Sequence, residues 1–217
     1  MPTRSYEIRV CSACGLRYPL VEGHPFGPRC PVCMADTQVV HSRALSSETA
    51  PRDDQKEGSG KTMAVLLDNI RSGWNVGSIL RSADGFGFSH AYLCGITPTA
   101  DNEAVTKTSL GAEDSVPWSY HRDAVKLVKG LKTGGWRVYG LEESVRALDI
   151  SHAERAIDSV QRKLLIIGNE VTGVDPELLD LCDQVFFIPM RGEKRSFNVA
   201  IAFSIAAYAL SIQNMAH

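Results

Sequence analysis

Residues 186–202 read F-F-I-P-M-R-G-E-K-R-S-F-N-V-A-I-A, and they pass from an apolar strand through a polar loop into an apolar helix. The helical pattern runs from Asn198 to Gln213 and is rich in Ala, Ile and Phe, as in buried helices. It opens on Ser196 and Asn198, where capping side chains meet unpaired backbone N–H groups. Capping explains one of these side chains, whereas a helix start at a sheet edge also suits a polar or anionic ligand. We therefore predict that the loop faces a binding site and that the helix is core or interface.

The same alternation of strand, loop and helix extends over residues 62–217. Several apolar runs are continuous rather than alternating, which is typical of parallel strands covered on both faces. The predicted strands are 63–68, 91–96, 136–141, 163–168 and 184–189, and the predicted helices are 76–85, 122–132, 176–182 and 198–213. This alternation predicts an α/β domain with a parallel sheet.

Two other strands of this domain also end in polar loops. In L-D-N-I-R-S-G-W-N-V-G-S-I-L-R, residues 67–81, Asn75 is predicted to cap a helix that starts near it, which places Arg81 in the second turn. In K-L-L-I-I-G-N-E-V-T-G, residues 163–173, Gly168 would let a ligand approach the backbone and Glu170 adds a carboxylate. Because ligands of open α/β sheets bind outside the carboxyl ends of the strands, these residues are site candidates. Arg81 has a second interpretation, as the solvent side of an amphipathic helix.

Clustered cysteines near the N-terminus indicate a metal site. Their pattern is C-x2-C-x15-C-x2-C, formed by Cys11, Cys14, Cys30 and Cys33. Two such knuckles can hold one Zn²⁺ ion, so residues 1–41 are predicted to be a zinc-ribbon-like segment with a structural, non-catalytic metal. Two disulfides are the alternative, disfavoured because no secretory signal is visible and a reducing compartment is expected. Residues 42–61 are polar and rich in Ser and Gly, which predicts a flexible linker.

The composition of the 217-residue chain limits the class of function. The formal net charge is −2, which excludes a uniformly basic coat for nucleic acid but leaves local basic patches open. The most apolar stretch, residues 197–212, is interrupted by Asn198 and Ser204 and is shorter than the about 20 residues that span a bilayer. We therefore predict no membrane segment and a cytoplasmic protein.

Three stretches together resemble the SPOUT superfamily, specifically its SpoU/TrmH-type 2′-O-ribose RNA methyltransferases. They are N-V-G-S-I-L-R-S-A-D-G-F-G (75–87), L-L-I-I-G-N-E-V-T-G-V (164–174) and I-P-M-R-G-E-K-R-S-F-N-V-A-I-A (188–202), in the family's order and spacing. The likeness runs from about residue 64 to residue 210 and leaves out the cysteine-rich segment. One departure is Phe197, where the family usually has Leu, an apolar exchange that should not abolish the chemistry.

The resemblance implies an α/β sheet domain whose C-terminal segment forms a trefoil knot, binds S-adenosylmethionine at the knot loops and works as a homodimer. On this chain, the implied cofactor contacts lie at the ends of three predicted strands and at the start of the last predicted helix. They are Leu141, Glu142, Gly168, Glu170, Ile188, Met190, Phe197 and Asn198. Alanines at 200, 202, 206 and 207 suit close helix packing, either in a dimer interface or in the core.

The resemblance also implies methyl transfer to a ribose 2′-hydroxyl of RNA, with tRNA and ribosomal RNA both left open. Arg81 matches the family's central arginine. A guanidinium, with a pKa above about 12, is a poor base, so we predict that Arg81 clamps the adjacent phosphate and stabilises the developing oxyanion. The residues predicted to hold Arg81, the ribose and the cofactor in register are Asn75, Glu170, Ser196 and Asn198. The general base is left open.

An alternative is a non-enzymatic, dimeric RNA-binding module in which the zinc ribbon binds RNA and the larger domain is a scaffold. It is disfavoured because every polar residue of the expected site is present. The role of the ribbon stays open, because arginines around its knuckles either face phosphates or are ordinary solvated surface.

Overall fold

The computed structural model describes residues 5–24, 27–45, 62–153 and 162–211. The chain forms two compact units, residues 1–57 and residues 58–217. Most of the predicted linker, residues 46–61, lies outside the described residues. The division into a ribbon, a linker and a larger domain at residues 41 and 61 stays a prediction.

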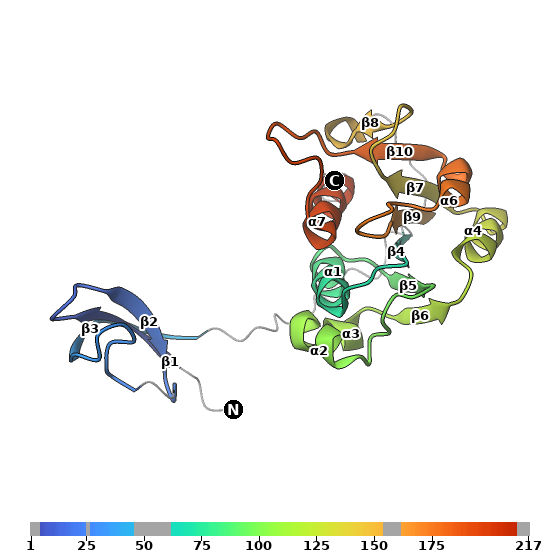
Figure 1. The fold of residues 1–217 in the computed structure, drawn as a ribbon. Coiled ribbons are helices and arrows are strands. Elements are labelled where there is room, and N and C mark those ends of the chain that lie inside the picture. Colours follow the sequence, from blue (N-terminus) through green and yellow to red (C-terminus); the bar gives the residue numbers. More distant parts are fainter. Residues whose placement is uncertain (1–4, 25–26, 46–61, 154–161, 212–217) are drawn as a thin grey trace, which may run out of the picture. The chain divides into compact units, whose positions relative to one another are not determined.

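The first unit contains a small antiparallel sheet (Figure 1). Its strands, in the sheet order β2-β1-β3, are β1 (Ser5–Cys11), β2 (Arg17–Val21) and β3 (Thr37–Ala44). Strand β3 continues past the predicted boundary at residue 41. Among the described residues of this unit, only Cys11 and Cys30 are buried. Apolar burial therefore contributes little to the stability of this unit.

The second unit contains a seven-stranded sheet among its described residues, with every strand pair parallel. The sheet order is β6-β5-β4-β9-β7-β10-β8. The strands are β4 (Thr62–Asp68), β5 (His90–Cys94), β6 (Trp118–His121), β7 (Arg137–Leu141), β8 (Leu148–Asp149), β9 (Arg162–Ile167) and β10 (Gln184–Phe187). Strand β9 lies between two strands that precede it in the sequence, so the carboxyl ends of β4, β9, β7 and β10 are neighbours.

Helices cover both faces of this sheet (Figure 1). They are α1 (Gly73–Gly85), α2 (Glu103–Ser109), α3 (Ala112–Ser115), α4 (Ala124–Thr133), the 3₁₀ helix η2 (Ile150–His152), α6 (Pro176–Leu181) and α7 (Val199–Ser211). Helices α1 and α7 pack on one face, whereas α4 and α6 pack on the other. The strands between them are buried on both sides, as their continuous apolar runs predicted.

One side of helix α7 belongs to the core. Phe203 is fully buried, and its ring meets that of Phe88 edge to face with the ring centroids 5.2 Å apart. The hydroxyls of Ser82 and Ser204 lie 2.8 Å apart and join α1 to α7. Residues 212 and 213, the end of the predicted helix, lie outside the described residues.

The parallel α/β fold confirms the prediction from the sequence, and the implied trefoil knot stays a prediction. The sequence did not predict β1, β2 and β3 of the first unit. In the second unit it did not predict α2, α3, β6, β8 and η2, which are short or polar. None of the helices in the described ranges is long and apolar enough to cross a membrane.

Candidate active site

The carboxyl ends of β7, β9 and β10 and the start of α7 surround a pocket of about 580 Å³. A volume of this size accommodates a small organic ligand. All eight residues predicted to contact a cofactor line it, together with Ser196. The structure thus brings together residues that are up to 57 positions apart in the sequence, from Leu141 to Asn198. Their role as cofactor contacts stays a prediction.

The side chain of Glu170, which lines this pocket, accepts hydrogen bonds from two backbone N–H groups and one side-chain amide. Its Oε2 accepts from the backbone N–H of Arg71 at 2.9 Å, and its Oε1 accepts from Ser72 N at 3.2 Å and Asn75 Nδ2 at 3.0 Å. Partial burial would raise the pKa of this carboxyl, but the hydrogen bonds, led by that from Arg71, hold the pKa below its usual value. Glu170 is therefore an ionised carboxylate at neutral pH.

Asn75 and Asn198 extend this network to the start of α7. Asn198 Nδ2 donates to Asn75 Oδ1 at 3.1 Å, while Asn198 Oδ1 accepts from the backbone N–H of Ala200 at 2.9 Å and so caps α7. Side chains from three separate strand–helix connections therefore form one hydrogen-bonded chain, Glu170–Asn75–Asn198. The predicted convergence of these three residues is what the structure shows.

The predicted capping role of Asn75 is wrong. Helix α1 starts at Gly73 with Ser72 as its N-cap residue, and Asn75 lies inside the first turn. No side-chain hydrogen bond of the described residues caps this end, and the Glu170 carboxylate accepts from the N–H groups of Arg71 and Ser72, which precede the first helical residue. The earlier start also places Arg81 in the third turn rather than the second.

The loop that carries Glu170 needs glycine at two positions. A Cβ on Gly168 would lie 2.2 Å from Val174 N, so a larger residue would push the two ends of the loop apart. Gly173 has a φ of +74°, and a Cβ there would lie 2.3 Å from Glu142 Oε2. That same Glu142 oxygen accepts from Val174 N at 2.9 Å. In this structure Gly168 thus serves loop closure, a different reason from the predicted approach of a ligand.

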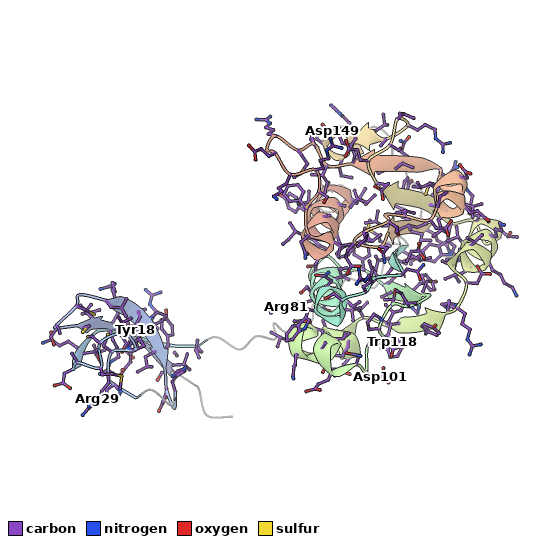
Figure 2. The ribbon with its side chains drawn as sticks, viewed as in Figure 1. Tyr18, Arg29, Arg81, Asp101, Trp118 and Asp149 are labelled. Carbon is purple, nitrogen blue, oxygen red and sulfur yellow. The ribbon has the colours of Figure 1, made fainter. Side chains whose placement is uncertain are left out.

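Arg81 does not line the pocket that holds Glu170. It is exposed on α1 (Figure 2). There it lines a second hollow of about 600 Å³ with Trp74, Lys107 and Asn198. Asn198 belongs to both hollows, so the two lie on either side of it. The guanidinium is therefore available to an external anion beside the first pocket.

The chemistry of the first pocket suits a ligand that is cationic in one part and apolar in another. Its lining contains three carboxylates, Glu142, Glu143 and Glu170, and one guanidinium, that of Arg195. Its apolar lining comes from Leu141, Ile167, Phe187, Ile188 and Phe197, among others. The surplus of carboxylates favours positive charge on the ligand.

The sequence did not point to Asn169 or Glu143, which line the same pocket. Asn169 stands between the two predicted residues Gly168 and Glu170, and this position was the available signal. Its contacts are with backbone groups, which leave no pattern in the sequence.

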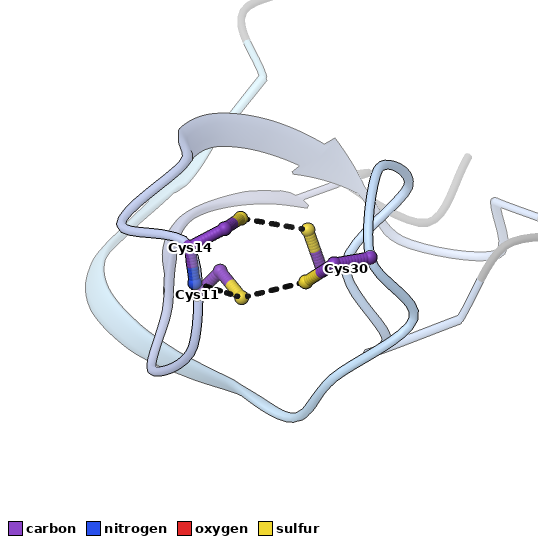
Figure 3. Close-up of side chains that lie close together, drawn as sticks. Cys11, Cys14 and Cys30 are labelled. Carbon is purple, nitrogen blue, oxygen red and sulfur yellow. Dashed lines mark hydrogen bonds between the residues drawn. The ribbon is translucent and has the colours of Figure 1, made fainter.

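The four clustered cysteines converge in the first unit. Their sulfurs all lie within 4.8 Å of one another, with Cys11 Sγ 3.4 Å from Cys33 Sγ and Cys14 Sγ 3.6 Å from Cys30 Sγ (Figure 3). Tetrahedral Zn²⁺ with Zn–S bonds of about 2.3 Å requires sulfurs about 3.8 Å apart. The cluster fits such an ion, whereas all four thiols are free, contrary to the disulfide alternative.

Ionisation within this cluster is uneven. The backbone N–H of Cys14 lowers the pKa of the Cys11 thiol to about 6. A hydrogen bond from the backbone of Ala35 lowers the pKa of Cys33, but the neighbouring thiols Cys11 and Cys14 outweigh it and raise that pKa to about 12. Full ionisation of the cluster therefore calls for a cation among the sulfurs.

The second unit is similar to a known protein family. The SpoU rRNA Methylase family matches residues 62–208. The 23S rRNA (guanosine(2553)-2′-O)-methyltransferase RlmP of Bacillus subtilis (strain 168) is 32% identical over 146 residues, which cover 67% of this chain and 56% of that protein. The chain spans between 56% and 60% of the length of the first curated relatives that it matches.

Solved structures show the same fold. The SpoU methyltransferase AviRb from Streptomyces viridochromogenes, in complex with the cofactor AdoMet, has a TM-score of 0.66 and 24% identity, and the match covers 84% of this chain and 70% of AviRb. The A. aeolicus TrmH/SpoU tRNA modifying enzyme has a TM-score of 0.64 and 24% identity, covering 71% of this chain and 76% of that one.

Proposed function

The chain belongs to the SpoU rRNA Methylase family, and on this premise we propose that it transfers a methyl group from S-adenosylmethionine to a ribose 2′-hydroxyl of tRNA or ribosomal RNA. The observation that carries the proposal is the pocket at the ends of β7, β9 and β10, with the chain Glu170–Asn75–Asn198 at its edge. The RNA substrates named for RlmP and for the A. aeolicus enzyme, and the cofactor named for AviRb, support it.

The lining of the pocket fits S-adenosylmethionine. When bound, this cofactor supplies an electrophilic methyl group on a positively charged sulfur, which leaves as a neutral thioether. Glu142 and Glu170 favour the positive charge, and Leu141, Ile188 and Phe197 offer apolar surface to the adenosyl part. Gly168 and Met190 complete the predicted contacts.

Arg81 and its neighbours are proposed to hold the RNA. The exposed guanidinium binds the phosphate beside the target ribose and stabilises negative charge on the 2′-oxygen. Asn198 lines both hollows and can therefore orient the ribose at the pocket edge, with Ser196 beside it. Glu170 fixes Asn75, and Asn75 fixes Asn198, so the network keeps these groups in register.

We further propose that the protein is a homodimer. Helices α1 and α7 leave large apolar side chains exposed, with Trp74 56%, Ile201 53% and Tyr208 57% accessible. A second copy of the chain would cover this apolar surface. Analytical ultracentrifugation of the wild type should give a dimer, whereas a monomer at micromolar concentration contradicts this proposal.

The cysteine cluster is proposed to hold one structural Zn²⁺ ion. Four thiolates close the coordination shell, so the ion has no open position for catalysis. Free thiols and an RNA substrate are consistent with the predicted cytoplasmic location.

The reaction is tested by incubating the full chain with methyl-labelled S-adenosylmethionine and total RNA, separated into tRNA and ribosomal fractions. Label in one fraction establishes the transfer and the substrate class together. Absence of label in both fractions, with no cofactor binding by calorimetry, contradicts the proposal and favours the non-enzymatic RNA-binding scaffold.

A further inference from the structure

The loop after β9 and the loop after β4 are joined by one amide side chain. Asn169 Nδ2 donates to the backbone carbonyl of Asn69 at 2.6 Å. From this contact we infer that Asn169 is a positioning residue, which sets Glu170 against the start of α1 and thereby orders the methyl-transfer site. The inference rests on the proposed function for its catalytic part, whereas its structural part stands on the contacts alone.

Asn169 first shapes its own loop. Its Oδ1 accepts from Val171 N at 2.9 Å and from Thr172 N at 3.2 Å. Its backbone pairs with Gly173 through two hydrogen bonds, of 3.0 and 2.9 Å. The amide oxygen therefore folds the loop, while the amide nitrogen remains for the contact with Asn69. One side chain thus serves two separable roles.

The acceptor of this contact is itself held firmly. Asn69 has a φ of +56°, a left-handed conformation that asparagine tolerates better than most residues. Its Oδ1 accepts from Ile96 N at 3.1 Å, and its Nδ2 donates to Asp68 Oδ1 at 2.8 Å. Gly95 leaves room for it, because a Cβ there would lie 2.0 Å from Asn69 Oδ1. The loop after β5 thus fixes the carbonyl to which Asn169 binds.

The contact lies next to the residues whose geometry matters. Glu170 directly follows Asn169, and Arg71 and Ser72 follow Asn69 by two and three positions. The carboxylate of Glu170 accepts from the backbone N–H groups of both these residues. A shift between the two loops at Asn169 would therefore displace Glu170 from those N–H groups and from Asn75. The hydrogen bonds of Glu170 therefore depend on the contact by which Asn169 holds the two loops together.

Two substitutions separate the two roles of Asn169. Asn169→Asp keeps an oxygen to accept from Val171 N and Thr172 N but places a second oxygen against the Asn69 carbonyl. Asn169→Ala removes both roles. The matched control is Asp123→Ala, which removes a side-chain-to-backbone bond of 2.9 Å that caps α4, outside both hollows. All three variants would be compared with the wild-type full chain.

Three measurements test the inference: amide hydrogen exchange at Arg71 and Ser72 by NMR, the Kd for S-adenosylmethionine, and kcat with RNA. In both Asn169 variants we expect exchange at these two amides to accelerate about five- to tenfold, as for the loss of one net hydrogen bond. We also expect the Kd for S-adenosylmethionine to rise and kcat with RNA to fall about 10- to 100-fold through misplacement of the site. Asp123→Ala should lower Tm without changing exchange at Arg71 and Ser72, the Kd or kcat.

Unchanged exchange at Arg71 and Ser72 in Asn169→Asp overturns the inference, because the contact with Asn69 would then not position Glu170. A loss of Tm alone, with Kd and kcat as in Asp123→Ala, would reduce Asn169 to an ordinary loop residue and also overturn it. If the wild type neither binds the cofactor nor transfers methyl, the proposed function fails, while the exchange experiment still decides the structural part.

Discussion

The two units of this protein differ in what stabilises them. Among its described residues, the first unit buries only two side chains, Cys11 and Cys30, and both belong to the cluster of four cysteines that could hold a metal ion. The second unit buries two apolar cores, one on each face of its parallel sheet. One unit is thus built around four sulfurs and the other around packed apolar side chains. We therefore expect the first unit to need a bound metal ion to stay folded and the second unit to fold without one.

Removing the metal should produce the largest difference in stability between the two units. A strong chelator is expected to unfold the first unit, because structural Zn²⁺ contributes about 10–16 kcal/mol of apparent binding free energy to small domains. The second unit should keep its own thermal transition. Circular dichroism and metal analysis by mass spectrometry would follow both units, with one Zn²⁺ per chain before treatment.

The control for the metal experiment is Cys94→Ala. Cys94 is a buried thiol of the second unit, and burial raises its pKa to about 12. This variant should keep one Zn²⁺ per chain, whereas Cys11→Ala should lose it. If chelation leaves the spectrum of the first unit unchanged, the proposal of a structural Zn²⁺ ion is wrong.

Truncating a core side chain of the second unit should destabilise that unit and leave the first unit unchanged. Phe203→Ala removes a fully buried ring that packs against Phe88, and such changes cost about 3–5 kcal/mol of unfolding free energy. The transition of the second unit should shift in urea, while zinc content stays constant. Loss of the metal in this variant would show that the units depend on each other for stability.

Arg81→Ala tests which part of the second unit carries the chemistry. Because Arg81 is exposed and lies outside the pocket proposed to bind the cofactor, its loss should leave the Kd for S-adenosylmethionine nearly unchanged. The rate of methyl transfer should fall by at least about 10²- to 10³-fold, as for the removal of an oxyanion-stabilising group. Single-turnover kinetics and calorimetry would measure the two quantities. Full activity in the variant would remove Arg81 from the mechanism.

Glu170→Gln should have a smaller but broader effect. The glutamine keeps one oxygen but turns an N–H₂ group toward a backbone donor, either Arg71 or Ser72. An imperfect hydrogen-bond replacement costs about 1–3 kcal/mol, so we expect cofactor Kd and kcat to worsen together by about tenfold. Glu177→Gln, an exposed carboxylate on α6 outside both hollows, is the control. Equal behaviour of the two variants would contradict the role of Glu170.

The sequence predicted much of the second unit because its strands are strongly apolar. The runs that became β4, β7, β9 and β10 are buried on both faces and carry a clear signal. Strand β6, with the sequence W-S-Y-H, lies at the sheet edge and is only partly buried, so no such signal marks it. Element prediction therefore failed where burial is weak.

The sequence pointed to the residues of the candidate site but not to their contacts, and their functional roles stay predictions. Resemblance and position at the strand ends identified Glu170, Asn75 and Asn198, and the structure joins them by hydrogen bonds. Local reasoning assigned Asn75 to the cap of α1, whereas the helix begins two residues earlier and the Asn75 side chain bonds Glu170 and Asn198, which follow two other strands. Asn169 was missed for the same reason, since its partner Asn69 is 100 positions away.

The most direct test of the proposed reaction is the position of the transferred methyl group. RNA labelled by the full chain would be hydrolysed in alkali, which cleaves every linkage with a free 2′-hydroxyl and leaves 2′-O-methylated positions as dinucleotides. The account predicts label in alkali-stable dinucleotides, lost in Arg81→Ala. Label confined to mononucleotides would place the methyl group on a base and contradict it.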